Sequence, residues 1–372
     1  MMSLFSIHQS KGLRRHLHRI GACWLLLLFS TIFVNADKGE TMAQTSYAVA
    51  AKTVEGFQVY YIQQDNKAVA EIVPALGNNC YAFKVAVDDT WLNLIDAPPD
   101  LATLETRPTA YGNPILFPFP NRIRNGAWQF EGKTYQFDKA PESPTTIHGL
   151  LLNRPYQVES HTADQNGATL TCSLNSQDFP EITRQYPFPF KIEITYNLKD
   201  AVLTMRTAIK NTGDQNMPMG FGIHPYFSVD LGTEADASQA VITVPAAKYW
   251  ELDEVLVPTG EQHTVTGTLD LQSGQPFSQL KLDHVFTDVQ LVDGVSRCVI
   301  ENRDTGYGMV MESDAQFREL VVYTPPGRDA ICFEPYTCPT DAINLEARGI
   351  SAGVIVLAPN ETFSGTVRFM LK

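Results

Sequence analysis

Two runs of alternating apolar and polar residues between Ile192 and Ile209 restrict the fold more than any other feature of the sequence. The apolar positions are Ile192, Ile194, Tyr196 and Leu198 in the first run and Leu203, Met205 and Ile209 in the second. Alternation with a period of two places the apolar side chains on one face of a β-strand. Because only a short polar step, Lys199-Asp200, separates the two runs, the pattern predicts an antiparallel hairpin.

Similar short apolar runs recur from about residue 51 onward and are separated by Gly, Pro, Asn or Asp. They cover residues 57–62, 81–87, 241–244, 309–311, 320–323, 331–333 and 353–357. No stretch has a twelve-residue helical period with caps at both ends, and 23 prolines disfavour long helices. Many strands without crossover helices imply antiparallel sheets packed face to face. We therefore expect an all-β chain with one large sandwich domain over residues 51–372.

The first 36 residues have the pattern of a secretory signal peptide. A basic segment containing Lys11, Arg14, Arg15 and Arg19 precedes an apolar run over residues 20–34, and Val34-Asn35-Ala36 resembles a cleavage site. We expect cleavage near Ala36, a flexible linker over residues 37–50, and a secreted or periplasmic protein. A retained membrane anchor is the alternative, although the apolar run is shorter than the roughly 18 residues expected of a spanning helix.

Charge and cysteine content exclude several classes of function. The formal net charge of −13 argues against nucleic acid or an anionic membrane as the main partner. Five cysteines follow residue 36, namely Cys80, Cys172, Cys298, Cys332 and Cys338. Their odd number does not indicate a disulfide-built scaffold, and without a C-x-x-C pair a thiolate zinc site is not expected.

Residues 220–228, Gly-Phe-Gly-Ile-His-Pro-Tyr-Phe-Ser, fix the direction of one histidine. Pro225 restricts His224 to extended conformations, while Gly220 and Gly222 permit close approach of the backbone. The aromatic neighbours can exclude water from an imidazole, the side chain that titrates near neutral pH. Taken alone, such a stretch is more typical of a structural core histidine, so the functional interpretation depends on other residues.

A glutamate follows a short apolar strand at Ile331-Cys-Phe-Glu334-Pro335. A carboxylate in such surroundings is seldom solvated surface, because buried carboxylates must be paired or functional. In a regular strand Cys332 and Glu334 share one face, and we expect Pro335 to end the strand. We also expect Cys332 to remain a free thiol near the same pocket.

Three further polar residues are candidates. Arg122, in Asn-Arg-Ile-Arg-Asn-Gly, can fork two hydrogen bonds to hydroxyls or a carboxylate. His148 precedes a glycine that can turn the chain, and Asp283 offers a carboxylate shortly before Phe286. Each has a simpler explanation when taken alone. Arg122 could lie in a solvated surface turn, His148 could be a structural histidine, and Asp283 could cap a turn.

Together these segments resemble the ordered motifs of the aldose 1-epimerases, also called galactose mutarotases, from about residue 55 to the C-terminus. The matching segments are Asn121-Arg-Ile123 with Gly126, His148-Gly149, Tyr186-Pro-Phe-Pro-Phe190, Gly222-Ile-His-Pro-Tyr-Phe227, Pro258-Thr-Gly260, Leu282-Asp-His-Val-Phe286, and Phe333-Glu-Pro335 with Asp341-Ala-Ile-Asn344. Each motif is weak, but seven in the family's order are specific. The resemblance implies a β-supersandwich of extended antiparallel sheets.

The resemblance also implies roles for the site residues. The catalytic histidine and glutamate fall on His224 and Glu334, and substrate binding falls on Arg122, His148 and Asp283. The chain departs from many members at Leu150 to Leu152, where a further glycine is common, and at Tyr336, where Trp is frequent. Both departures bear on which sugar fits, and neither removes a reacting group.

Anomer interconversion fits these residue types. The base takes the proton of the C1 hydroxyl while the acid protonates the ring oxygen, and the ring opens to an aldehyde. With ordinary pKa values of about 4.3 and 6.5, Glu334 is the base and His224 the acid. No metal or organic cofactor is needed, and the expected partner is a monosaccharide such as glucose or galactose. The sequence leaves two alternatives: a hexose-6-phosphate epimerase and a non-catalytic carbohydrate-binding sandwich with Trp128 and Trp250 as stacking platforms.

Overall fold

The hairpin expected between Ile192 and Ile209 is confirmed. In the computed structural model, which describes residues 46–232 and 235–372, it consists of β13 (Phe190–Lys199) and β14 (Val202–Asn211). The register pairs Leu198 with Leu203 and Ile192 with Ile209. The alternating apolar side chains of β13 are fully buried, as the period of two requires.

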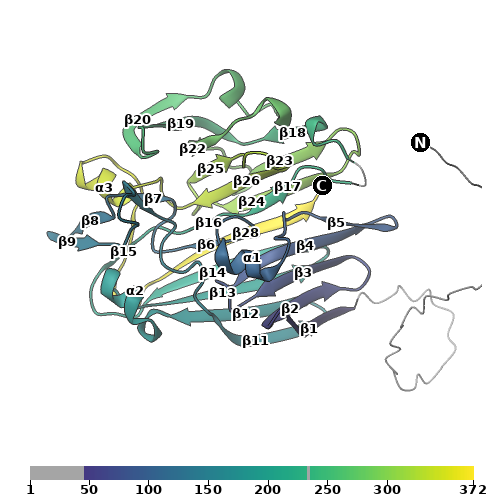
Figure 1. Cartoon of the computed structure of the whole chain (residues 1–372), viewed down its shortest axis with the longest axis horizontal. Helices are drawn as coiled ribbons and strands as arrows, with labels where there is room; N and C mark the ends of the chain where they lie inside the picture. Colours follow the sequence, from purple (N-terminus) through teal and green to yellow (C-terminus); the bar gives the residue numbers. More distant parts are fainter. Residues whose placement is uncertain (1–45, 233–234) are drawn as a thin grey trace, which may run out of the picture. The chain divides into compact units, whose positions relative to one another are not determined.

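Three sheets form the body of the described chain, and all their strand pairs are antiparallel (Figure 1). A five-stranded sheet contains, in order, β1 (Tyr47–Val54), β2 (Phe57–Gln64), β3 (Ala68–Val73), β4 (Asn79–Val87) and β5 (Thr90–Asn93). A nine-stranded sheet contains β11 (Gln157–Asp164), β12 (Gly167–Asn175), β13, β14, β28 (Thr362–Leu371), β24 (Gly308–Asp314), β23 (Val295–Asn302), β18 (Ala240–Thr243) and β21 (Gln275–Pro276).

The third sheet positions most of the candidate site. Its order is β20 (Pro258–Thr264), β19 (Ala246–Leu252), β22 (Asp283–Val289), β25 (Glu319–Tyr323), β26 (Ala330–Tyr336), β16 (Gly222–Ile223) and β6 (Ile115–Leu116), and β17 (Tyr226–Ser228) also pairs with β26. Three two-stranded ribbons accompany the sheets: β7 (Arg122–Arg124) with β10 (Thr145–Ile147), β8 (Ala127–Phe130) with β9 (Lys133–Gln136), and β15 (Met217–Met219) with β27 (Ile355–Leu357).

The sheets pack face to face around a shared apolar core, as expected of a sandwich. β1, β2 and β3 contact β12 and β13, and the ring of Phe227 in β17 lies 5.6 Å from that of Phe369 in β28. The α-helices of the described chain are six residues each: α1 (Leu101–Thr106), α2 (Pro180–Gln185) and α3 (Ala342–Ala347). Among the described residues, no helix is long and apolar enough to cross a membrane. The all-β prediction is therefore confirmed.

Two boundaries differ from the sequence predictions. The linker expected over residues 37–50 extends too far, because β1 already begins at Tyr47 and pairs with β2 along its length. Pro335 does not end its strand, because β26 continues to Tyr336 and Pro335 lies opposite Leu320. The predicted signal peptide over residues 1–36 lies outside the described residues.

Candidate active site

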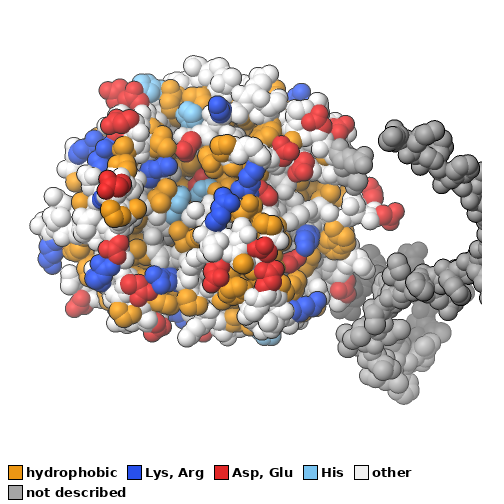
Figure 2. Space-filling view, in the orientation of Figure 1, with side chains coloured by type: hydrophobic (Ala, Val, Ile, Leu, Met, Phe, Trp, Pro, Cys, Tyr) orange, Lys and Arg blue, Asp and Glu red, His pale blue; other side chains and the backbone are white. Residues whose placement is uncertain are grey.

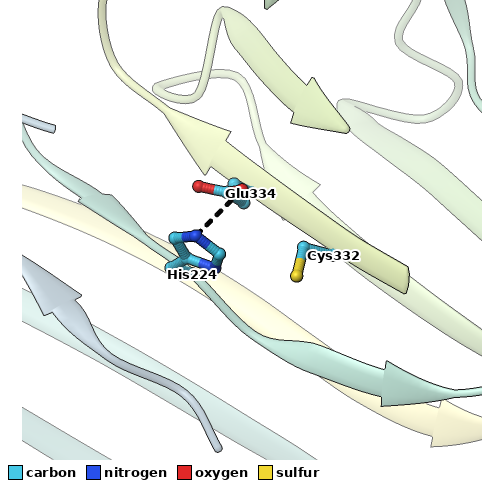
Figure 3. A group of neighbouring side chains, drawn as sticks. All are labelled: His224, Cys332 and Glu334. Carbon is cyan, nitrogen blue, oxygen red and sulfur yellow. Dashed lines mark ion pairs between the residues drawn. The ribbon is translucent and has the colours of Figure 1, made fainter. Parts of the chain in front are cut away.

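Strand register brings His224 and Glu334 together. β16 pairs Gly222 with Tyr336 of β26, and β17 pairs Tyr226 with Cys332 of the same strand. His224 lies midway between these two pairs, and Glu334 lies midway between their partners, so the two residues face each other. The Nε2 atom of His224 is 3.2 Å from Oε1 of Glu334, and both side chains are buried (Figure 3).

The glycines upstream of His224 allow this close packing. A Cβ atom at Gly222 would lie 2.3 Å from the ring of Tyr336, and one at Gly220 would lie 2.5 Å from Sγ of Cys338. Tyr226 stacks on the His224 ring at a centroid distance of 4.8 Å and an interplanar angle of 12°. The imidazole is therefore fixed in orientation, as the Gly-x-Gly and His-Pro pattern predicted.

His148 reaches the same place from a different part of the chain. Its ring lies edge-on to that of His224 at a centroid distance of 5.2 Å. Its φ of +65° is in the left-handed region, and its backbone N–H donates to the carbonyl oxygen of Asn121 at 2.7 Å. Asn121 also has a positive φ, of +54°. Two strained non-glycine residues beside a buried acid–base pair are typical of a functional site.

The Nδ1 atoms of His148 and His224 are both buried without a hydrogen-bond partner among the described residues. Buried polar groups are normally paired, so each unpaired group requires an explanation. A polar ligand in the site would provide the missing partners. The space-filling view shows histidine side chains in the middle of one face of the molecule, between acidic and basic side chains (Figure 2).

Arg122 and Asp283 flank the pair. The Nη1 atom of Arg122 donates to Oδ1 of Asn121 at 3.0 Å, and its positive charge opposes the upward shift in the pKa of Glu334. Asp283 begins β22 and lies opposite Tyr323, which in turn lies opposite Cys332. Its negative charge contributes to raising the pKa of Glu334. The structure thus brings together all five residues predicted from the sequence, although Asp283 does not contact the pair directly.

Sequence reasoning missed two supporting residues. Tyr336 donates its O–H to Oε2 of Glu334, and the side chain of Asn121 hydrogen-bonds to Tyr336. The position of Tyr336 could have been predicted, since a residue two positions after Glu334 in a strand lies on the same face. This prediction was not made because we expected the strand to end at Pro335.

Burial shifts the pKa values of both residues away from the ordinary values of about 4.3 for glutamate and 6.5 for histidine. It lowers the pKa of His224 to about 3 and raises the pKa of Glu334 well above its usual range. Burial also lowers the pKa of His148, and the charges of His224 and Arg122 add to this effect. The His224 imidazole is therefore neutral at neutral pH, and burial favours the protonated form of the Glu334 carboxyl.

Cys332 lies on the same face of β26 as Glu334, as predicted, and is a free buried thiol (Figure 3). Its sulfur, the His224 nitrogen and a Glu334 oxygen lie within 4.8 Å of one another. Imidazole, thiolate and carboxylate are all ligands of zinc, so this donor set can accept such an ion.

Known proteins resemble this chain in sequence and in fold. The chain is 28% identical to the uncharacterized protein YihR of Escherichia coli over 242 residues, which cover 64% of this chain and 74% of YihR. It is 26% identical to human galactose mutarotase over 158 residues, covering 42% of this chain and 44% of the human protein. The crystal structure of a galactose mutarotase-like protein from Clostridium acetobutylicum matches with a TM-score of 0.81 at 23% identity, covering 88% of this chain and 99% of that one.

A family model also matches most of the sequence. It is described as aldose 1-epimerase and covers residues 58–370, a range that contains every strand from β3 to β27 and all five predicted site residues. On this match, and with the fold that the solved structures share, the chain belongs to the aldose 1-epimerase family.

Proposed function

We propose that this protein interconverts the α and β anomers of a free hexose, such as glucose or galactose, by acid–base ring opening and reclosure. The observation that carries the proposal is the 3.2 Å separation between the His224 imidazole and the Glu334 carboxyl in a buried site. The C1 hydroxyl and the ring oxygen of a pyranose are bonded to the same carbon. A base and an acid that serve these two oxygens must therefore be close neighbours.

In the proposed reaction, Glu334 takes the proton of the C1 hydroxyl while His224 delivers a proton to the ring oxygen. The bond between C1 and the ring oxygen breaks, and C1 becomes an aldehyde. After rotation about the bond between C1 and C2, the former ring oxygen attacks the other face of the carbonyl. The two residues exchange roles in this step, so the pair returns to its starting protonation state.

The remaining residues have binding roles in this proposal. His148 stays neutral because burial lowers its pKa, so it can both donate and accept hydrogen bonds near the anomeric centre. Arg122 presents a permanent cation with several donors for the ring hydroxyls, and Asp283 can accept hydrogen bonds from other ring hydroxyls. Sugars mutarotate without a catalyst, so an acid and a base worth ~10²–10⁴-fold each supply much of the required acceleration.

Polarimetry of freshly dissolved α-glucose and α-galactose tests the proposal. We expect His224→Asn and Glu334→Gln each to lose at least 100-fold of the enzyme-dependent rate. Glu312→Gln is the matched control, since Glu312 is another buried strand carboxylate, paired with Arg297 and Arg368 outside the site. Full activity in both site variants would contradict the assignment.

The same experiments separate the two alternatives. Faster turnover of glucose 6-phosphate than of glucose would favour a hexose-6-phosphate epimerase. Sugar binding in calorimetry without any change in the mutarotation rate would favour a non-catalytic binding module.

A secreted or periplasmic location is part of the proposal. It rests on the basic and apolar segments before Ala36. Amino-terminal sequencing of the protein recovered from cells is expected to begin near Asp37, and a mature protein that retains residue 1 would contradict it.

A further inference from the structure

His224 is oriented without a hydrogen bond to its second ring nitrogen. Its Nε2 atom faces Glu334, but its Nδ1 atom has no partner among the described residues. In functional histidines a hydrogen bond at one ring nitrogen commonly fixes the tautomer and leaves the other nitrogen free to react. Because the described part of the chain supplies no such bond, packing against neighbouring rings must set the plane of this imidazole.

Three rings surround the imidazole, and one of them lies parallel to it. Tyr226 stacks on His224 at a centroid distance of 4.8 Å and an interplanar angle of 12°. The rings of His148 and Tyr323 meet it edge to face, at 5.2 and 6.4 Å. The direction in which Nε2 of His224 points therefore depends on where the ring of Tyr226 is held.

Tyr226 is anchored at both ends by the segment that connects α1 to β6. Its phenolic O–H donates to the carbonyl oxygen of Thr109 at 2.5 Å, and its backbone N–H donates to the carbonyl oxygen of Gly112 at 2.9 Å. The backbone N–H of His224 donates to Pro114 of the same segment at 2.9 Å. A displacement of residues 109–114 would therefore move the stacked tyrosine and the histidine together.

Arg328, in the turn between β25 and β26, holds this segment and the tyrosine in place. Its guanidinium carbon lies 5.0 Å from the ring centroid of Tyr226 and 4.2 Å from that of Tyr111. Its Nη1 atom donates to the carbonyl oxygen of Ala110 at 2.7 Å, and its Nη2 atom forms an ion pair with Asp96. The side chain is only 23% exposed, so these charge-assisted and cation–π contacts are partly shielded from water, which strengthens them.

We propose that Arg328 is a positioning residue that acts on His224 through the ring of Tyr226. The inference rests on the proposed function and adds to it a residue that works through another side chain. When His224 takes up a proton during ring opening, the stacked geometry also places the imidazolium on the electron-rich face of Tyr226, which favours that state. A small displacement of the tyrosine ring would misalign Nε2 for proton transfer.

Steady-state polarimetry of Arg328→Met tests the kinetic consequence. We expect kcat for galactose to fall about tenfold with KM nearly unchanged, because the sugar contacts remain while the acid is misaligned. Arg328→Lys keeps a cation beside the two tyrosines but loses the forked geometry of the guanidinium, so its kcat should lie between those of Arg328→Met and the wild type. Arg328→Lys also decides the kinetic test should Arg328→Met fail to fold.

Arg154→Met is the matched control. Arg154 likewise combines an ion pair, with Glu181 at 2.6 Å, and a cation–π contact, 6.0 Å from the ring of Phe179, but it lies outside the candidate site. We expect this variant to keep the kcat and KM of the wild type.

NMR spectroscopy of the protein with ¹³C-labelled histidine measures the stacking itself. The Hε1 signal of His224 is the one that His224→Asn removes. A proton over the face of an aromatic ring is shielded, so we expect Tyr226→Leu to move this signal downfield. Arg328→Met should move it in the same direction by a smaller amount, and Arg154→Met should leave it in place.

A purely structural role for Arg328 has a different signature. Arg328→Met would then lower the denaturant midpoint, while the folded protein kept its kcat and its His224 signal, and this result would overturn the inference. Failure of the proposed function is distinguishable, since the wild-type protein would then not accelerate mutarotation of any hexose tested. In that case the NMR shifts decide: a downfield shift in both Tyr226→Leu and Arg328→Met supports the positioning role, and an unchanged signal in Arg328→Met rejects it.

Discussion

Tyr336 donates its phenolic O–H to Oε2 of Glu334, while the other carboxyl oxygen, Oε1, faces Nε2 of His224 at 3.2 Å. The two residues lie on one face of β26, two positions apart. Tyr336 is in turn hydrogen-bonded by Asn121, whose Oδ1 accepts from Arg122. Three residues thus orient the carboxyl that serves as base in the proposed reaction, and Tyr336 acts on catalysis through Glu334.

Replacing Tyr336 with phenylalanine tests this arrangement. The hydrogen bond from Tyr336 lowers the pKa of Glu334 against the larger effect of burial, so its removal raises that pKa further. We expect the alkaline limb of the kcat/KM profile to move to higher pH and kcat to fall about tenfold. Tyr186→Phe is the control, because Tyr186 is a buried tyrosine whose hydroxyl donates to the carbonyl of Pro218. An unchanged or lower alkaline midpoint in Tyr336→Phe would contradict the role of the tyrosine.

The pH dependence of the wild-type protein follows from burial of the pair. The active pair holds one proton. It gains a second only when the pH falls through the pKa of His224, about 3, and loses its proton only above the raised pKa of Glu334. We therefore expect kcat/KM for galactose to show no acid limb above about pH 5. An acid limb with a midpoint near the ordinary histidine value of about 6.5 would show that the free enzyme does not bury the pair in this way.

Glu319 affects stability in a pH range of its own. It accepts hydrogen bonds from Trp250 and Thr287 at the start of β25, and burial raises its pKa to about 8. Between its usual pKa and pH 8 the unfolded chain holds fewer protons at this residue than the folded one, so stability falls as the pH rises. The full loss is on the order of 5 kcal/mol and is complete above pH 8.

Glu319→Gln removes this titration. We expect the variant to be at least as stable as the wild type at pH 8, and to lose less unfolding free energy between pH 5 and pH 8. Denaturant unfolding at the two pH values measures both quantities. Equal pH dependence in the two proteins would mean that the carboxyl is already ionised in the folded state at neutral pH.

The Cys332, His224 and Glu334 cluster predicts inhibition by added zinc. Zinc bound by these three side chains would occupy the groups that the proposed reaction uses. We expect micromolar zinc to suppress mutarotation, a chelator to restore it, and Cys332→Ala to need at least tenfold more zinc. Cys338→Ala removes another buried thiol, two residues after the end of β26 and outside the cluster, and should behave as wild type. Equal zinc sensitivity in all three proteins would place the inhibitory ion elsewhere.

Much of the fold could be predicted from the sequence, because it follows from side-chain alternation. The period of two between Ile192 and Leu198 gives the buried face of β13, and the short step at Lys199 and Asp200 fixes the register with β14. The same alternation correctly predicted that Cys332 and Glu334 lie on one face of their strand. The boundaries were less predictable. Pro335 stays inside β26 even though proline cannot donate a ladder hydrogen bond.

The sequence by itself determined the strand pattern, the orientation of the histidine in Gly-Ile-His-Pro, and through the resemblance the identity of the five candidate site residues. Tertiary structure decided which of them touch. The pairing of β16 and β17 with one strand, β26, sets His224 opposite Glu334, and no local pattern encodes that long-range register. It also decided the burial that shifts the pKa values of the pair, and the left-handed conformation of His148. Burial and backbone strain depend on neighbours that are distant in the chain, so they become visible only in the folded protein.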